Sequence, residues 1–145
     1  MPEQETLERA REDEREGKAP STQAGEFVRE EIEHVREGKH GARSTKQAIA
    51  IGLSKARRAG VKLSPPKKGS KKTRKQAARD VAKGKRKGSK KSAKRSRATS
   101  RALKREGRSA ASKRALSRQA RSAARKRSAA SRSRSARKAA ATRKK

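Results

Sequence analysis

Apolar side chains are few in this chain, and the clearest helical pattern among them covers residues 22–37. There they recur at helical spacing and form a narrow stripe, which predicts an amphipathic helix. Gly38 follows the last turn and is suited to end the helix. The stripe consists of Ala24, Phe27, Val28, Ile32 and Val35.

A second amphipathic pattern lies in residues 43–60, which have the sequence RSTKQAIAIGLSKARRAG. Ser44 or Thr45 can cap the start of a helix here. Two short amphipathic helices joined by a glycine-containing turn can shield each other's apolar face, so we expect a small helical hairpin of marginal stability at residues 22–60. The side chains that the hairpin would hide are Phe27, Ile32, Val35, Ile49, Ile51 and Leu53.

The remaining segments have little to bury. Residues 1–21 form an acidic N-terminal extension, residues 61–72 a linker rich in Pro, Gly and Lys, and residues 73–145 a basic tail of low complexity. We expect a short helix over about 73–83, whose start resembles part of the 43–60 pattern either as a degenerate copy or by chance. It has too few apolar residues to dock firmly. No alternation typical of strands is visible, so we expect no β-sheet.

Composition points to disorder over most of the chain. Only 28% of the 145 residues are apolar, many of these are Ala, and the formal net charge is +33. Burial on this scale does not offset chain entropy, so we expect a mostly disordered chain with short α-helices. The chain has no Cys and no long apolar run. We therefore expect no disulfide, no signal peptide and no membrane span, and a cytoplasmic location.

Charge divides the chain unevenly. Residues 1–37 hold 12 of the 14 acidic side chains and six Lys or Arg, whereas residues 67–145 hold 34 Lys or Arg and only two acidic side chains, Asp80 and Glu106. Such a basic segment gains free energy by meeting a phosphate backbone and releasing counterions, so the expected partner is duplex DNA, with RNA as the alternative. The acidic segment can compete with nucleic acid for the tail, or it can be a solvated helix face.

Lys and Arg of the linker and tail are expected to carry the binding, because their charges match phosphates and Arg can contact phosphate in a bidentate manner. Four arginines in residues 114–125 recur at i, i+4, i+7 and i+11, which is one helical stripe. Residues 101–130 either gain helix on binding or stay disordered in the complex. The predicted nucleic-acid-binding residues are Lys67, Lys68, Lys71, Lys72, Arg74, Lys75, Arg101, Arg105, Arg108, Arg114, Arg118, Arg121, Arg125, Lys126, Arg127, Arg132, Arg134 and Arg137.

No group of residues predicts catalysis, a cofactor or a metal site. Glu31 and His34 form a Glu-x-x-His pair, but the di-metal bundles that use this pair need further copies, and the chain has one. His40 has no partner in the sequence.

Phe27 is the only Phe, Tyr or Trp, which argues against base-stacking platforms for single strands or RNA. Serines beside arginines, as in residues 131–135, are candidate phosphorylation sites, although composition alone makes such pairs common.

Residues 43–60 resemble a segment shared by a family of small basic bacterial proteins, with the pattern Ser/Thr-x-Lys-Gln-Ala-Ile-Ala-Ile-x-Leu-Ser-x-Ala-Arg-x-Ala-Gly. Members of that family are often labelled DNA-binding. The basic tail resembles, in composition, the Lys-, Ala- and Ser-rich tails of bacterial histone H1-like proteins. Both resemblances imply a DNA-binding, nucleoid-associated protein, and neither transfers a catalytic or binding residue.

We therefore expect a non-enzymatic protein that binds DNA without sequence specificity, as histone H1-like proteins do, by neutralising phosphates with its basic tail. One alternative is a protein that binds structured RNA or the ribosome. Another is an adaptor that docks a protein partner through residues 43–60, with Ile49 and Leu53 at the contact, while the tail only localises it.

Overall fold

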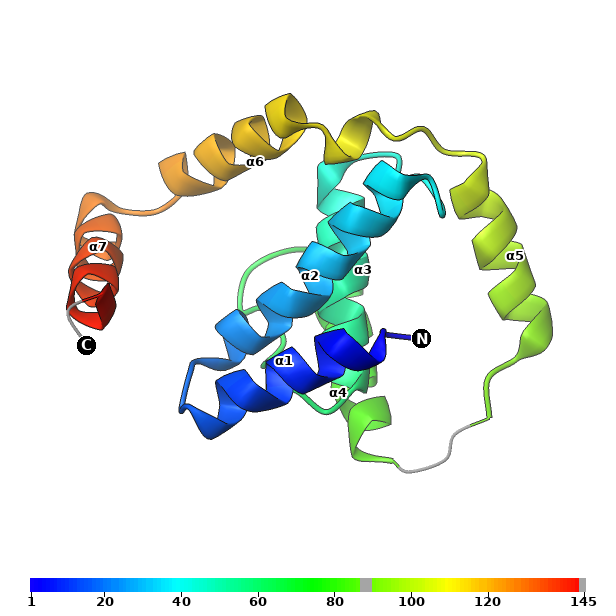
Figure 1. The fold of residues 1–145 in the computed structure, drawn as a ribbon, viewed down its shortest axis with the longest axis horizontal. Helices are drawn as coiled ribbons and strands as arrows, with labels where there is room; N and C mark the ends of the chain where they lie inside the picture. Colours follow the sequence, from blue (N-terminus) through cyan, green and yellow to red (C-terminus); the bar gives the residue numbers. More distant parts are fainter. Residues whose placement is uncertain (87–89, 144–145) are drawn as a thin grey trace.

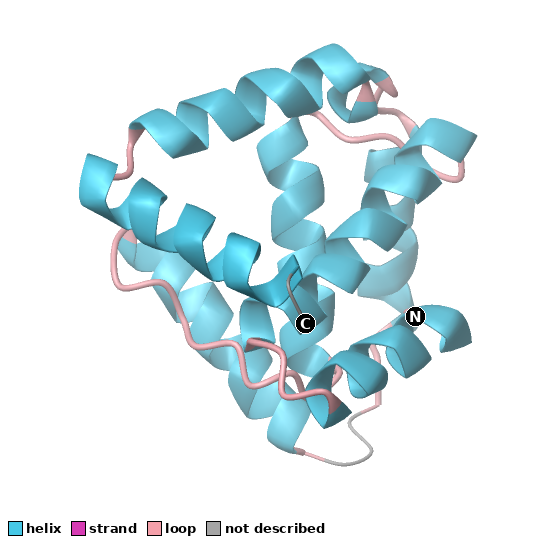
Figure 2. Cartoon of the chain, turned by 60° about the vertical axis from the view of Figure 1, so that its left-hand side comes forward, coloured by secondary structure: helices cyan, strands magenta, loops and turns pink. Residues whose placement is uncertain are grey.

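The computed structural model describes residues 1–86 and 90–143, and most of these residues are helical (Figure 1). Helices and loops make up the described part, which has no strand (Figure 2). The expectation of a mostly disordered chain is therefore wrong. The elements are α1 (Gln4–Arg15), α2 (Pro20–Glu37), α3 (Thr45–Arg58), α4 (Lys71–Lys85), α5 (Ala93–Lys104), the 3-10 turn η1 (Ser109–Ala111), α6 (Lys113–Arg125) and α7 (Ala129–Arg143).

Helices α1 to α4 form a small bundle in which α2 packs against both α1 and α3, and α4 packs against α3. Helix α5 lies on one side of this bundle and α7 on the other, while α6 leads away from the end at which α2 meets the loop to α3 (Figure 1). Helices α5, α6 and α7 contain no buried residue. The described helices include none that is long and apolar enough to cross a membrane.

Two apolar clusters hold the bundle together. Eight of the eleven buried apolar side chains in the described part are Ala. Ile49 and Ile51, which were expected to be hidden, are only half-buried and lie outside both clusters. The first cluster consists of Ile32, Val35, Ala42, Ala48, Ala110 and Ala111, with Val28 and Leu116 packed against it; the second consists of Ala10, Ala24, Phe27 and Ala56, with Leu7, Leu53, Val61 and Leu63 packed against it.

Small residues allow these helices to pack closely, and this explains how so few large apolar residues suffice. A Cβ atom placed on Gly52 of α3 would lie 2.6 Å from the Cα of Val28 in α2, so the two backbones meet there without a side chain between them. Close backbone approach increases the dispersion contacts that each small residue makes. The inference from composition to disorder failed because it counted large apolar side chains and gave no weight to this kind of packing.

Serine caps explain why the basic tail is also helical. The side chains of Ser70, Ser92 and Ser112 accept hydrogen bonds from the backbone amides three residues further on, at the starts of α4, α5 and α6. Each such cap satisfies an amide that has no partner within its helix and stabilises the helix by about 1 kcal/mol. Between the caps, Ala, Lys and Arg all have high helix propensity. Residues 101–125 are therefore largely helical without a bound partner.

Helix α4 docks on α3 through a buried carboxylate, although the sequence had predicted that this segment could not dock firmly. Asp80 is buried, and its Oδ1 lies 2.7 Å from Nε of Arg58 in α3. The hydroxyl of Ser54 donates a hydrogen bond of 2.8 Å to Oδ2. A polar anchor thus replaces the apolar stripe that the pattern lacked.

Residues 103–111 of the tail return to the bundle and pack against the loop between α2 and α3. The amide of Gly41 donates to the carbonyl of Leu103 (2.9 Å), and the amide of Ala42 donates to that of Gly107 (3.1 Å). The hydroxyl of Thr45 donates to the carbonyl of Ala110 (2.6 Å). These bonds attach the start of α6 to the bundle.

Candidate nucleic-acid interface

All eighteen basic residues predicted to bind nucleic acid are exposed. Two lie in the loop before α4 and four in its first turns. One lies in the last turn of α5, two lie between α5 and η1, and the rest lie on or beside α6 and α7. The predicted tail (residues 73–145) also includes residues 87–89 and 144–145, which lie outside the described residues. The structure therefore distributes the predicted residues over several helices.

Helix α6 carries the most ordered basic array. Arg114, Arg118, Arg121 and Arg125 lie within about 60° of one another around the helix axis, at 100° per residue. With Ser117, Ser122 and Lys126 they line an open surface hollow of about 690 Å³. Leu116, on the same helix, packs against the first apolar cluster and fixes which face turns outward. The array is about 16 Å long, because each residue advances the helix by about 1.5 Å.

Arg127 is held differently from the arginines of this array. Its Nη2 donates to the carbonyl of Ser131 (3.1 Å) and to the hydroxyl of Ser135. These bonds span the connection between α6 and α7. Arg127 therefore has fewer donors left for a phosphate than the four arginines of the array.

The ion pairs, like the acidic residues, are concentrated in the N-terminal part of the chain. In the described part, every ion pair joins residues between Glu3 and Asp80, and none uses a Lys or Arg of residues 67–145. The acidic side chains of α1 and α2 pair within the bundle: Glu26 lies 2.9 Å from Arg9, and Asp13 lies 2.8 Å from Lys18. Hydrogen bonds to Asp13 and Glu16 raise the pKa of Lys18.

This pairing bears on the predicted competition between the acidic segment and nucleic acid. In the described structure the acidic side chains of this segment pair with basic residues of the bundle, and none forms an ion pair with a Lys or Arg of the tail. A side-chain contact between a basic tail residue and this segment joins Lys91 to the sulfur of Met1. Removing residues 1–37 would also remove α1 and α2, including the buried Phe27 and Val35. A truncation of this kind would unfold the bundle, so it would not isolate the effect of the acidic charge.

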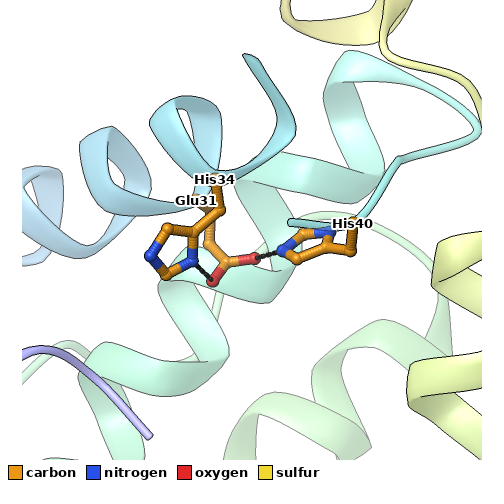
Figure 3. Close-up of side chains that lie close together, drawn as sticks. All are labelled: Glu31, His34 and His40. Atoms are coloured by element: carbon orange, nitrogen blue, oxygen red, sulfur yellow. Dashed lines mark ion pairs between the residues drawn. The ribbon is translucent and has the colours of Figure 1, made fainter. Parts of the chain in front are cut away.

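A second polar arrangement, which the sequence did not predict, lies where α2 meets α3. Glu30 and Glu31 of α2 are almost completely buried, and Lys55 of α3 reaches both, with its Nζ 3.5 Å from Oε1 of Glu30 and in hydrogen-bonding contact with Oε1 of Glu31. Two imidazoles flank Glu31, those of His34 on α2 and of His40 on the following loop (Figure 3).

The turn after α2 brings His40 to this position. Gly38 has a φ of 79°, in the left-handed region, and ends α2 so that the chain turns back. Nε2 of His40 then lies 3.2 Å from Oε2 of Glu31. The prediction that His40 has no partner missed this contact, because a turn conformation and not a sequence spacing creates it.

His34 is also held from its other side. Its Nε2 lies 2.9 Å from Oε1 of Glu3, in the segment that leads into α1. Hydrogen bonds from His34 and from Lys39 hold the pKa of the Glu3 carboxyl below its usual value. The cluster formed by Glu30, Glu31, His34, His40 and Lys55, which we call the α2 polar cluster, thus joins three parts of the bundle.

Part of the chain is similar to a known protein family. Residues 21–68, about a third of the chain, match a family of unknown function, DUF6496. The matched region covers α2 from its second residue, all of α3 and most of the following loop, and it ends before α4. No curated protein and no solved structure matches the chain. The part of this protein that is similar to that family is therefore the pair of helices that carries the α2 polar cluster.

Proposed function

We propose that this protein binds duplex DNA through its phosphate backbone, without sequence specificity, using basic helices attached to a small helical bundle. The observation that carries the proposal is the lack of internal partners for the tail's charge. The 31 Lys and Arg of residues 67–145 that the structure describes are all exposed, and none of them pairs with a carboxylate there. Phosphates can therefore be neutralised without first breaking ion pairs within the protein.

The array on α6 is the best candidate for direct phosphate contact. Four guanidinium groups on one helical face repel one another when no anion is near, since like charges at i, i+4 destabilise a helix by about 0.2–0.5 kcal/mol per pair. Phosphates placed against the array would remove this repulsion and accept charge-assisted hydrogen bonds. Ser117 and Ser122 add hydroxyl groups to the same surface.

Helical presentation favours duplex DNA over double-stranded RNA. The major groove of B-form DNA is about 12 Å wide and admits an α-helix, whereas the major groove of A-form RNA is too narrow for side chains to read. An exposed helix with one arginine-lined face is therefore better matched to DNA. The absence of Trp and Tyr from the sequence argues in addition against single-strand binding by base stacking.

The adaptor alternative has less support. Helix α3 is in contact with α2 on one side and with α4 on another, and Leu53 packs against the cluster that contains Phe27. Ile49 is only half-exposed. A partner that needed both side chains would have to displace elements of the bundle.

Competition between nucleic acids tests the proposal. A labelled DNA duplex bound to the full-length protein is challenged with unlabelled duplexes of DNA and of RNA, with equal length and at the same salt concentration. We expect the DNA competitor to displace the label at the lower concentration, and a scrambled DNA sequence to compete equally well. Stronger competition by RNA would support the RNA alternative, and failure to bind either nucleic acid would refute the proposal.

A further inference from the structure

We propose that Glu31, His34 and His40 form a binding site for a divalent transition-metal ion of the Zn²⁺ type. The three side chains offer one carboxylate oxygen and two imidazole nitrogens, and these ligand atoms all lie within 4.8 Å of one another (Figure 3). Nitrogen and carboxylate ligands of this kind are those that Zn²⁺ and its neighbours use in proteins. This site is separate from the α6 array and does not depend on nucleic-acid binding.

The two oxygens of Glu31 have different surroundings. Oε1 is in contact with the ammonium group of Lys55. Oε2 accepts no hydrogen bond from any described residue, although the Glu31 side chain is only 1% exposed. A buried carboxylate oxygen without a donor is costly, since its desolvation is not compensated. A metal ion bound to Oε2 would supply that compensation and leave the contact with Lys55 in place.

Both imidazoles are oriented as metal ligands usually are. Nε2 of His34 lies 2.9 Å from a carboxylate oxygen of Glu3, and Nδ1 of His40 lies 2.9 Å from the backbone carbonyl of Gly41. A ligating histidine almost always donates its other ring N–H to a carboxylate or a carbonyl, which fixes the tautomer. In each ring this leaves the opposite nitrogen, Nδ1 of His34 and Nε2 of His40, facing Glu31.

The distances between the three ligand atoms fit a small ion if the side chains move slightly closer together. Bonds of about 2.0–2.1 Å in a tetrahedral site place ligand atoms about 3.3–3.4 Å apart. Nε2 of His40 is already 3.2 Å from Oε2 of Glu31, and the ligand atoms of the three side chains all lie within 4.8 Å of one another. His34 would have to move closer to the ion, since its Nδ1 lies 3.8 Å from Oε1, the oxygen that Lys55 contacts. With three protein ligands, the fourth position would be taken by water.

Local charge also favours a cation, even though the whole chain is strongly basic. Glu30 and Glu31 bring two buried carboxylates, and among the described residues Lys55 is the one lysine that forms ion pairs with both. Of the three proposed ligands, His40 lines an open hollow of about 610 Å³ between the α2–α3 loop and residues 104–108, so its ring faces solvent on that side. An ion could reach the site from this side.

Binding would tie α2 to the loop that follows it. That loop is also where residues 103–111 attach, through the bond from Gly41 to Leu103. An ion that holds His40 would therefore stabilise the junction between the bundle and the basic tail. Any agent that binds the folded chain and not the unfolded chain raises its apparent stability.

Titration of the chelator-treated full-length protein with Zn²⁺ tests the inference, with affinity measured by competition against a chromogenic chelator and stability by thermal unfolding. At a hundredfold excess over Kd we expect the Tm to rise by about 5 to 10 °C. H40Q and E31Q should each weaken Zn²⁺ binding by at least about tenfold, since even the loss of an outer-shell partner costs that much. E33Q is the matched control, because it removes the same charge from the same helix at a side chain that is 46% exposed and pairs with Arg29 outside the site.

A spectroscopic measurement on the unaltered protein guards against variants that unfold. The chain has two histidines and no cysteine, so any imidazole ligation must come from this site. We expect bound Co²⁺ to give the intense visible absorption of a four-coordinate site with nitrogen ligands. A six-coordinate spectrum with oxygen ligands only, equal Zn²⁺ affinity in the native protein and H40Q, or no binding at micromolar Zn²⁺ would each overturn the inference.

Discussion

Neutralising the array on α6 should have an effect on DNA binding that can be calculated. In the first variant, Arg114, Arg118, Arg121 and Arg125 are all replaced by Gln, which keeps high helix propensity and removes four charges from one face. Each phosphate contact contributes about 0.9 to the slope of log K against log salt. Loss of all four contacts should therefore make the slope shallower by about 3.6.

The same relation gives the loss of affinity. At about 0.15 M salt, a difference of 3.6 in slope corresponds to roughly a thousandfold weaker binding, or about 4 kcal/mol. The measurement is a series of fluorescence-anisotropy titrations of a labelled duplex at several salt concentrations. Circular dichroism of the variant checks that α6 is still helical.

A variant of α7 with the same charge serves as the control. Replacing Arg132, Arg134, Arg137 and Arg143 by Gln also removes four charges, but at 100° per residue these side chains point in two opposite directions around α7. One duplex can meet about half of them at a time, so the slope should change by about 1.8 and the affinity by roughly thirtyfold. Equal losses in the two variants, or a slope unchanged in the α6 variant, would refute the assignment of binding to an oriented array.

Two further predictions concern the helices themselves. G52A should lower the free energy of unfolding by about 1–3 kcal/mol in chemical denaturation, because the added Cβ would meet the Cα of Val28 at 2.6 Å. G25A, in α2 with no heavy atom within 4 Å of its added Cβ, should instead raise it by about 0.5–1 kcal/mol. A change in stability of the same sign in both variants would contradict the close packing. S112A should lower the stability of α6 by about 1 kcal/mol, measured as helical circular dichroism lost on heating. S117A, a substitution within the helix, should not lower it. If the melting of S112A equalled that of the unaltered protein, the cap would have no role.

Some of the fold was accessible from the pattern of apolar residues. The segments expected to be helical, 22–37 and 43–60, match α2 and α3 with boundaries that differ by two residues at most, because apolar spacing and the Gly38 cap are local signals. The arginine stripe on α6 could likewise be read from spacing alone, since any helix over those residues puts them on one face.

Other features depended on contacts that spacing does not encode. The serines at 70, 92 and 112 are ordinary members of a Ser-rich tail by composition, yet each caps a helix, and the run of helix-forming residues after each one was the signal that could have identified them. The docking of α4 rests on Asp80 meeting Arg58 across 22 positions of sequence. A single acidic residue within a basic tail was the available hint, because burial of one carboxylate needs a specific basic partner.

The α2 polar cluster also could be predicted only in part from sequence spacing. Glu31 and His34 are three positions apart on one helix and could be paired from sequence. His40 joins them only because Gly38 reverses the chain, and Lys55 because α3 packs against α2. Tertiary contacts of this kind cannot be inferred from residue types alone.

The most direct test of whether phosphate neutralisation supplies the binding free energy is to measure how DNA binding by the unaltered protein depends on salt concentration. The dissociation constant of the full-length protein for a duplex of random sequence is measured over a range of salt concentrations. If about ten phosphates are engaged, log K should fall with a slope near −9, equally for the duplex and for its scrambled version. A slope shallower than about −2, or a preference of orders of magnitude for one sequence over its scrambled version, would contradict the mechanism.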